Sequence, residues 1–238
     1  MQRQSQASFT RNHLLSVLPA DDFESLRPHL ERVQLNLRYV LEEPGQPIEH
    51  VYFPEPGVAS VIAILPSGER MEVGLFGPEG MSGHPIILGA DHSPLQSFIQ
   101  VAGSGIRIKA DRLRAVMESS GTLHKLLLRY VHVFSVQVAH TALSNGRQTI
   151  DERLARWLLM CHDRVDGDVI PITHEFLALM LGVRRAGVTT AIHILEGAKI
   201  IRTDRGRIEI LDRAELREGA GECYGVPEAE YERLINGR

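Results

Sequence analysis

A group of basic and hydroxyl side chains lies in the segment ITHEFLALMLGVRRAGVTTAIHIL, which runs from Ile172 to Leu195. If its second half is helical, five polar side chains share the outward face: Arg184, Arg185, Thr189, Thr190 and His193. Arginine pairs bidentately with guanine or with phosphate, and threonine reaches base edges and thymine methyl groups. These residue types at this spacing predict contacts with double-stranded DNA.

Two short helices joined by a tight turn would position these side chains. Thr173 is expected to cap a first helix that ends at Leu181, and its N-terminal N–H groups make Thr173 a candidate phosphate contact. Gly182 supplies the positive φ of the turn. The inward positions are apolar: Leu177, Leu181, Val183, Val188 and Ala191. This spacing is typical of a helix-turn-helix. The alternative is an ordinary helical hairpin, which rarely places two arginines at the start of its second helix.

The next segment, AKIIRTDRGRIEIL, predicts a basic β-hairpin. Two short β-like runs flank the turn residues Asp204, Arg205 and Gly206. A helix-turn-helix followed by a hairpin is a winged helix, and Arg202, Arg205 and Arg207 are placed for phosphate. The second helix would enter the major groove, where Arg185 is the candidate base contact.

The charge distribution agrees with this interpretation although the chain has a net charge of -4. Residues 184–207 hold six basic and two acidic residues, whereas the C-terminal segment is acidic. A length of 238 residues allows one large domain or two ordinary ones. We expect a cytoplasmic protein without membrane contact, because no apolar run approaches the roughly 20 residues of a membrane span and residues 1–15 hold no apolar stretch of the length typical of a signal peptide. Two cysteines exclude a disulfide framework.

Upstream, residues 33–108 predict an all-β barrel or sandwich, since short apolar runs alternate with Gly- and Pro-rich turns. One or two short helices are expected between Asn12 and Leu30, and a further one begins at Asp111.

A long helix is expected from Thr122 to about Ser144, with NGR at 145–147 as its break. Two apolar seams predict burial on two sides. The β-domain can cover one side, so a second copy of the chain is expected on the other. Burial in a single large core is the alternative. The candidate dimer interface is the first seam: Leu123, Leu127, Tyr130 and Phe134. Thr149 and Glu152 then predict a capping box for the next helix.

In this order of parts the chain resembles the cyclic-AMP receptor protein and Fnr family of bacterial transcription regulators. The resemblance covers about residues 11–213 and is strongest in GERMEVGLFGPEGMSGHPIILG, DERLARWLLM and the segment quoted first. It implies an α+β fold: a cyclic-nucleotide-binding-like β-roll (a jelly roll) over 1–118, a dimerisation helix over 119–147, a winged helix over 148–216 and an acidic tail over 217–238. It also implies a homodimer on a palindromic operator, with RNA polymerase as a partner.

The chain departs from the family in both expected sites. Nucleotide-binding members carry Gly-Glu and Arg-Ser or Arg-Thr pairs, which correspond here to Gly83-His84 and Gln96-Ser97. A neutral glutamine cannot neutralise a buried phosphate, and residues 71–106 contain no arginine or lysine. We therefore expect no cyclic AMP and no other cofactor, as in a branch that lacks the nucleotide signature. Ala186 and Thr190 also depart from the family's recognition helix, which implies a different operator.

Other chemistry has weak support in the sequence. His124, His132 and His140 recur every eight residues, so they do not share a helical face, and we expect no metal or haem site. Cys161 falls on an apolar helix face, which does not suit a nucleophile, and no enzyme is predicted. Two alternatives stay open: a cyclic-nucleotide-responsive regulator with a rearranged pocket, and a ligand-binding module whose winged helix contacts protein.

Overall fold

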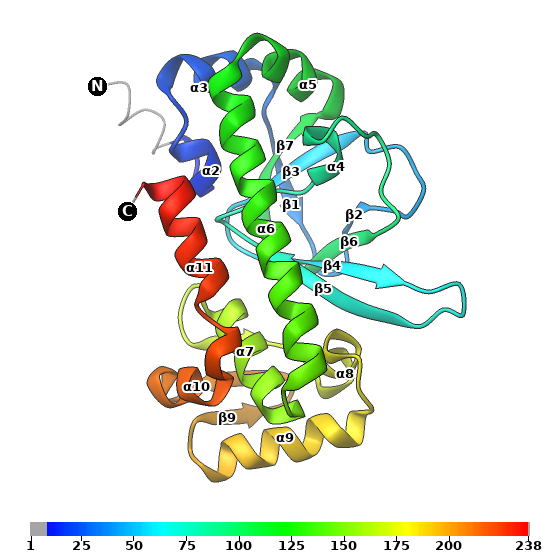
Figure 1. Ribbon diagram of the computed structural model, residues 1–238, viewed down its shortest axis with the longest axis vertical. Helices are drawn as coiled ribbons and strands as arrows, with labels where there is room; N and C mark the ends of the chain where they lie inside the picture. Colours follow the sequence, from blue (N-terminus) through cyan, green and yellow to red (C-terminus); the bar gives the residue numbers. More distant parts are fainter. Residues whose placement is uncertain (1–8, 238) are drawn as a thin grey trace.

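The computed structural model describes residues 9–237 and shows a β-roll and a winged helix joined by one long helix (Figure 1). Short helices precede the β-roll, as expected between Asn12 and Leu30. Asn12 caps the first of them by accepting a hydrogen bond from the N–H of Leu15. These elements are α2 (His13–Ser16), α3 (Ala20–Leu26) and the 3-10 turn η1 (Arg27–His29).

The predicted β-region forms two antiparallel sheets that face each other. One has the order β1-β7-β3 and the other the order β2-β6-β4-β5. A short helix, α4 (His84–Ile87), interrupts the strands. The strands are β1 (Glu31–Leu35), β2 (Val40–Glu42), β3 (His50–Pro54), β4 (Val58–Ile64), β5 (Arg70–Phe76), β6 (Gln96–Val101) and β7 (Gly103–Lys109). The β-roll expected from the sequence is therefore confirmed.

The long helix α6 (Gly121–Arg147) follows α5 (Ala110–Ser119) and passes along the whole molecule (Figure 1). The predicted break at 145–147 is wrong, because the helix continues through Gly146 and ends at Arg147, with Gln148 as its C-cap. Asn and Gly each cost up to about 1 kcal/mol in a helix. Packing of this last turn offsets that cost: Ser144 is buried, and the amide of Asn145 contacts the sulfur of Met71.

The expected dimer interface is also wrong, because its four side chains fill the core of their own chain. They are between 1% and 9% exposed: Leu123, Leu127, Tyr130 and Phe134. The Tyr130 hydroxyl accepts from the N–H of Met81, and a Cβ on Gly74 would lie 2.8 Å from the Phe134 ring. Periodicity identified an apolar seam, but the β-roll covers it. The outward face of α6 carries Leu128 and Leu143, which are 40% and 50% exposed.

The winged helix begins with α7 (Ile150–His162), where Thr149 and Glu152 form the predicted capping box. The domain continues through β8 (Val169–Pro171), α8 (His174–Leu181), α9 (Arg185–Gly197), β9 (Ile201–Asp204) and β10 (Arg207–Ile210), with sheet order β8-β10-β9. One apolar cluster extends from β4 and β5 into this domain, so the two parts share a continuous core.

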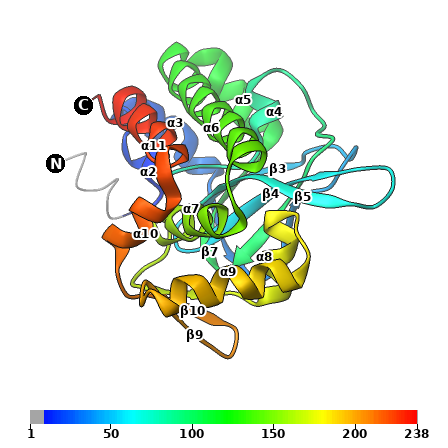
Figure 2. The same cartoon turned by 60° about the horizontal axis from the view of Figure 1, so that its bottom comes forward.

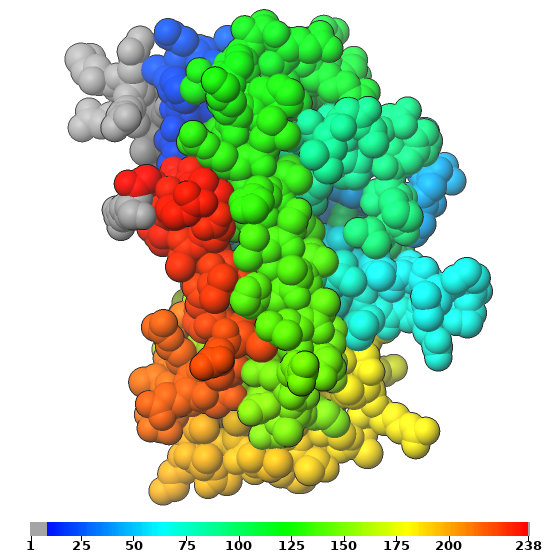
Figure 3. Space-filling view, in the orientation of Figure 1, coloured from blue at the N-terminus to red at the C-terminus, as the bar shows by residue number. Residues whose placement is uncertain are grey.

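The acidic C-terminal segment is helical and returns along α6 (Figures 1 and 3). It comprises α10 (Arg213–Ala220), η2 (Gly221–Cys223), α11 (Val226–Tyr231) and the turn η3 (Glu232–Asn236). The expected boundary at 216/217 thus falls inside α10. Glu230 pairs with His132 of α6 at 3.1 Å, and the Tyr231 hydroxyl donates to the carbonyl of Glu79 at 2.7 Å. The tail therefore connects the winged helix with the β-roll.

Within residues 9–237, no single helix has the length and apolarity needed to cross a membrane, while the bent pair α8 and α9 meets that test only when its two helices are added together.

Candidate nucleic-acid interface

The helix-turn-helix has the geometry that the sequence predicts. The Thr173 hydroxyl accepts from the N–H of Phe176 at 3.2 Å, and Gly182 ends α8 with a φ of 62°. Helices α8 and α9 meet at 106°, within the range of DNA-binding helix pairs. Val188 points into the core and is fully buried. Because the inner face of α9 packs in the core, its outer face is open to solvent.

The outer face of α9 presents most of the predicted contacts to solvent. Arg184, Arg185, Thr190 and His193 are exposed, and Thr189 is half-buried. The Thr189 hydroxyl donates to the Arg185 carbonyl at 3.1 Å and lies 3.5 Å from the His174 ring. Figure 2 shows α9 and the β9–β10 hairpin at the same end of the molecule. The two predicted DNA-contacting elements therefore share one surface.

The hairpin carries the three predicted phosphate contacts in different environments. Arg202 pairs with Glu209 along the hairpin, and Arg207 lies 3.9 Å from Asp204. Arg205 sits at the turn with a positive φ and has no ion pair among the described residues. Its guanidinium is thus the one most available to a phosphate.

A cleft of about 610 Å³ separates the N-terminus of α8 from the hairpin. It brings together Thr173, Arg185, Arg205 and Arg207, which lie up to 34 positions apart in the sequence. His174 also lines this cleft, although it was not among the residues predicted to contact DNA. The signal was present, because His174 directly follows the N-cap, where N–H groups are free for an anion.

Two contacts fix the helix pair α8 and α9 against neighbouring elements. The guanidinium of Arg153 on α7 donates to the carbonyl of Leu181, at the end of α8. The Glu196 carboxylate on α9 accepts from the Thr203 N–H at 2.8 Å and from its hydroxyl at 2.6 Å. These Thr203 hydrogen bonds hold the pKa of Glu196 below its usual range. The hairpin is therefore fastened to the C-terminal part of α9.

The second predicted site, in the β-roll, is assembled around a residue that sequence analysis missed. Glu42 on β2 is buried and accepts from the N–H of Gly83 at 2.6 Å. Strand register places Ser97 opposite Glu42. Burial raises the pKa of Glu42, and the Gly83 hydrogen bond opposes that effect. Glu42 lies 41 positions before Gly83 and has no local motif, so only the fold identifies it.

The other two residues of this predicted site, His84 and Gln96, contact different groups. The His84 ring stacks on Phe134 with centroids 4.1 Å apart, and its Nε2 is buried without a hydrogen-bond partner in the described chain. Burial lowers the pKa of His84 to about 4, so the ring is neutral at pH 7. Gln96 points away and donates to Glu43 at 3.0 Å. No group of three metal-ligating side chains occurs among the described residues.

The architecture of the chain is a β-roll joined by a long helix to a winged helix. Residues 152–218 match the model of the Crp-like helix-turn-helix domain. This stretch is therefore similar to a Crp-like helix-turn-helix domain, and solved structures of CRP- and FNR-family regulators share the fold of the chain.

Three solved structures show the shared fold. The chain is 20% identical to TTHB099, a CRP-family transcriptional regulator from Thermus thermophilus, with 81% of this chain and 97% of that one covered and a TM-score of 0.66. For FixK2 from Bradyrhizobium japonicum the identity is 18%, the coverages are 79% and 96%, and the TM-score is 0.67. For TTHA1359, a CRP/FNR-family regulator also from Thermus thermophilus, they are 23%, 80%, 98% and 0.65. No curated protein sequence matches the chain.

Proposed function

We propose that the chain is a sequence-specific transcription regulator that binds a palindromic operator as a homodimer. The cleft between α8 and the hairpin supports this proposal, because it gathers three arginines and a helix N-terminus beside the exposed face of α9. Such a surface binds the DNA backbone while α9 contacts bases in the major groove. On a promoter in the cytoplasm, its further partner would be RNA polymerase. The exposed arginines of the hairpin favour DNA over a protein partner.

The outward face of α6 is the dimer surface in this proposal. Exposed residues recur there at alternating spacings of three and four, as in a coiled-coil seam. Leu128 lies near one end, and small residues that permit close helix approach follow it. The exposed seam is Lys125, Leu128, His132, Ser135, Ala139 and Ala142. On a palindromic operator, the two copies of α9 would bind half-sites about 34 Å apart, one turn of DNA.

The β-roll in this proposal does not bind cyclic AMP. The Glu42 carboxylate already takes the Gly83 N–H, and a buried carboxylate would repel the ligand's phosphate. The rival is a cyclic nucleotide held in a rearranged pocket. Calorimetric titration of the full chain with cyclic AMP distinguishes them, and binding at micromolar concentration would contradict our proposal.

Binding to DNA should weaken with salt, and Arg205→Ala should reduce that dependence. Each phosphate contact contributes about 0.9 to the slope of log K against log salt, so the loss of Arg205 from both copies should lower the slope by about 1.8. Retardation of operator fragments over a salt series measures it. Arg112→Ala, on α5 of the β-roll domain, is the matched control. A DNA affinity that does not change with salt concentration would contradict the proposal that the chain binds DNA.

Arg185→Ala should relax specificity at one base pair of each half-site. A bidentate arginine–guanine contact discriminates by about 1–3 kcal/mol against other bases. Selection from a random DNA pool gives the operator, and retardation of single-position variants then measures the loss. An equal loss for all sequences would show that Arg185 contacts only phosphate.

A further inference from the structure

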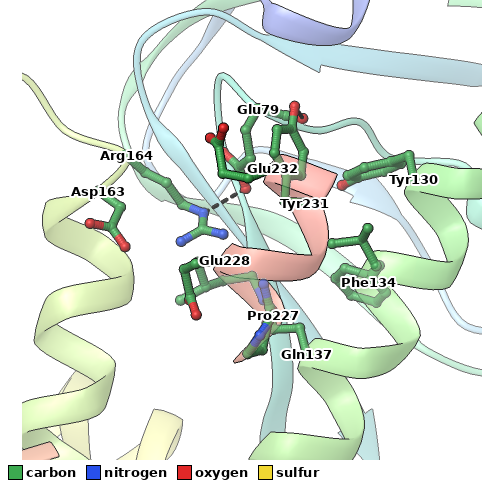
Figure 4. Close-up of a pocket in the computed structure, with 12 residues that line it drawn as sticks. Glu79, Tyr130, Phe134, Gln137, Asp163, Arg164, Pro227, Glu228, Tyr231 and Glu232 are labelled. Carbon is green, nitrogen blue, oxygen red and sulfur yellow. Dashed lines mark hydrogen bonds and ion pairs between the residues drawn. The ribbon is translucent and has the colours of Figure 1, made fainter. Parts of the chain in front are cut away.

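A cavity of about 210 Å³ lies between α6 and the C-terminal tail (Figure 4). Its walls come from β5 and the loop after it, from α6, from the end of α7 and from α11. One side is apolar and includes Leu75, Val133 and Pro227. None of the four residues expected to bind a nucleotide lines it, although Phe134 does and stacks on His84. The cavity is thus a separate site at the junction of both domains.

The polar side of the cavity has an excess of negative charge. Four carboxylates line it, against the single guanidinium of Arg164: Glu79, Asp163, Glu228 and Glu232. Arg164 is 8% exposed and already bonded, through Nε to Glu79 and through Nη1 to the carbonyl of Met160, both at 2.6 Å. Little of its positive charge remains for an anionic ligand.

Two of these carboxylates have no cationic partner in the described part of the chain. Glu228 accepts from the N–H of Gly225 and Glu232 from the amide of Asn236, both at 2.8 Å. Burial alone would lower the pKa of Arg164, yet the surrounding carboxylates, Glu79 foremost, raise it overall. The potential in the cavity therefore favours a cation.

The side of the cavity that faces these carboxylates offers aromatic rings and an amide. Figure 4 shows Tyr130, Phe134 and Gln137 projecting from α6 toward Arg164 and its acidic neighbours. The Gln137 carbonyl accepts from the N–H of Leu75 at 2.8 Å, which leaves its NH₂ group for another acceptor. Aromatic faces attract ammonium groups by about 0.5–2 kcal/mol.

We propose that this cavity binds a small organic amine, with its ammonium group at Glu228 and Glu232 and its apolar body against Leu75, Val133 and Phe134. The volume supports a single-ring ligand, since pockets for drug-sized molecules start at about 300 Å³. A bound amine would hold the tail, α6 and α7 together, and would stabilise the arrangement of the winged helix seen here.

Calorimetry of the full-length chain with three matched probes tests the charge preference. Benzylamine is cationic, benzyl alcohol is neutral and benzoate is anionic, with similar size. We expect benzylamine to bind at least about tenfold more tightly than benzyl alcohol, and benzoate not to bind. Equal affinity for the three probes, or a preference for benzoate, would overturn the proposal.

Variants locate the site. The double change Glu228→Gln and Glu232→Gln should weaken benzylamine at least about fivefold and leave benzyl alcohol unaffected, whereas Glu222→Gln, on the exposed η2 turn, should change neither. Val133→Phe should fill the cavity and abolish both. Benzylamine affinity unchanged by the double variant would refute the site even if Val133→Phe failed to fold. Retardation of DNA without amine reports the proposed function separately.

Discussion

Glu72→Gln should change how stability depends on pH. As the pH rises from 5 to 8, the free energy of unfolding of the variant should rise by roughly 2.5 kcal/mol relative to that of the wild type. The Glu72 carboxyl on β5 is buried, and it accepts from the Ser60 hydroxyl at 2.6 Å and from the Trp157 indole N–H at 2.7 Å. Burial raises its pKa from 4.5 to about 7, although these hydrogen bonds and the charges of Arg156 and Arg164 oppose the rise.

The folded and unfolded states hold the Glu72 proton over different pH ranges. The folded chain keeps the Glu72 proton up to about pH 7, whereas the unfolded chain releases it near pH 4.5. The contribution of Glu72 is therefore fully present below pH 4.5 and is lost as the pH rises through 7. Glutamine does not titrate, so the variant escapes this loss.

Buried His84 acts in the opposite direction over part of the same range. Its pKa is lowered from 6.5 to about 4, so its contribution is present above pH 6.5 and is lost as the pH falls toward 4. The two contributions to the free energy of unfolding offset each other in the wild type. In Glu72→Gln only the His84 contribution remains, so the variant should become more stable as the pH rises from 5 to 8. Urea unfolding at pH 5, 6, 7 and 8 measures this, with exposed Glu69→Gln as the control. Parallel pH profiles for wild type and Glu72→Gln would contradict the pKa assignment.

The helix-turn-helix could be predicted from sequence because its determinants are local. A hydroxyl N-cap at Thr173, a glycine turn at Gly182 and an inward Val188 act within 16 residues, and each is where the pattern places it. The capping box of Thr149 and Glu152 is equally local. Short-range geometry and hydrogen bonding determine such features. Their hydrogen-bond partners can therefore be identified from the sequence without knowledge of the tertiary fold.

Features that depend on distant partners could not be predicted in the same way. The seam that includes Tyr130 is apolar whichever surface covers it, so periodicity could not distinguish the β-roll from a second chain. Glu42 meets Gly83, and Glu72 meets Trp157, only through strand register and domain packing. The acidic composition of the tail predicts exposure, whereas Tyr231 anchors the tail to Glu79. In each case a single long-range contact decides the outcome.

Trp157→Ala should destabilise the chain by about 3–5 kcal/mol, the largest loss we expect from one side chain. Trp157 is 4% exposed in the core that joins β4 and β5 to the winged helix. Truncation opens a cavity and also removes a hydrogen bond from buried Glu72. Circular dichroism must follow the unfolding, because Trp157 is the one tryptophan of the sequence.

Trp157→Phe separates packing from hydrogen bonding, since phenylalanine fills much of the space but donates nothing. The indole hydrogen bond lowers the pKa of Glu72, so its loss should raise that pKa further and destabilise the chain more at pH 8 than at pH 5. A double-mutant cycle with Glu72→Gln should give a coupling of about 0.5–3 kcal/mol at pH 8 that shrinks at pH 5. A coupling of zero at both pH values would mean that Trp157 joins the two domains by apolar packing alone.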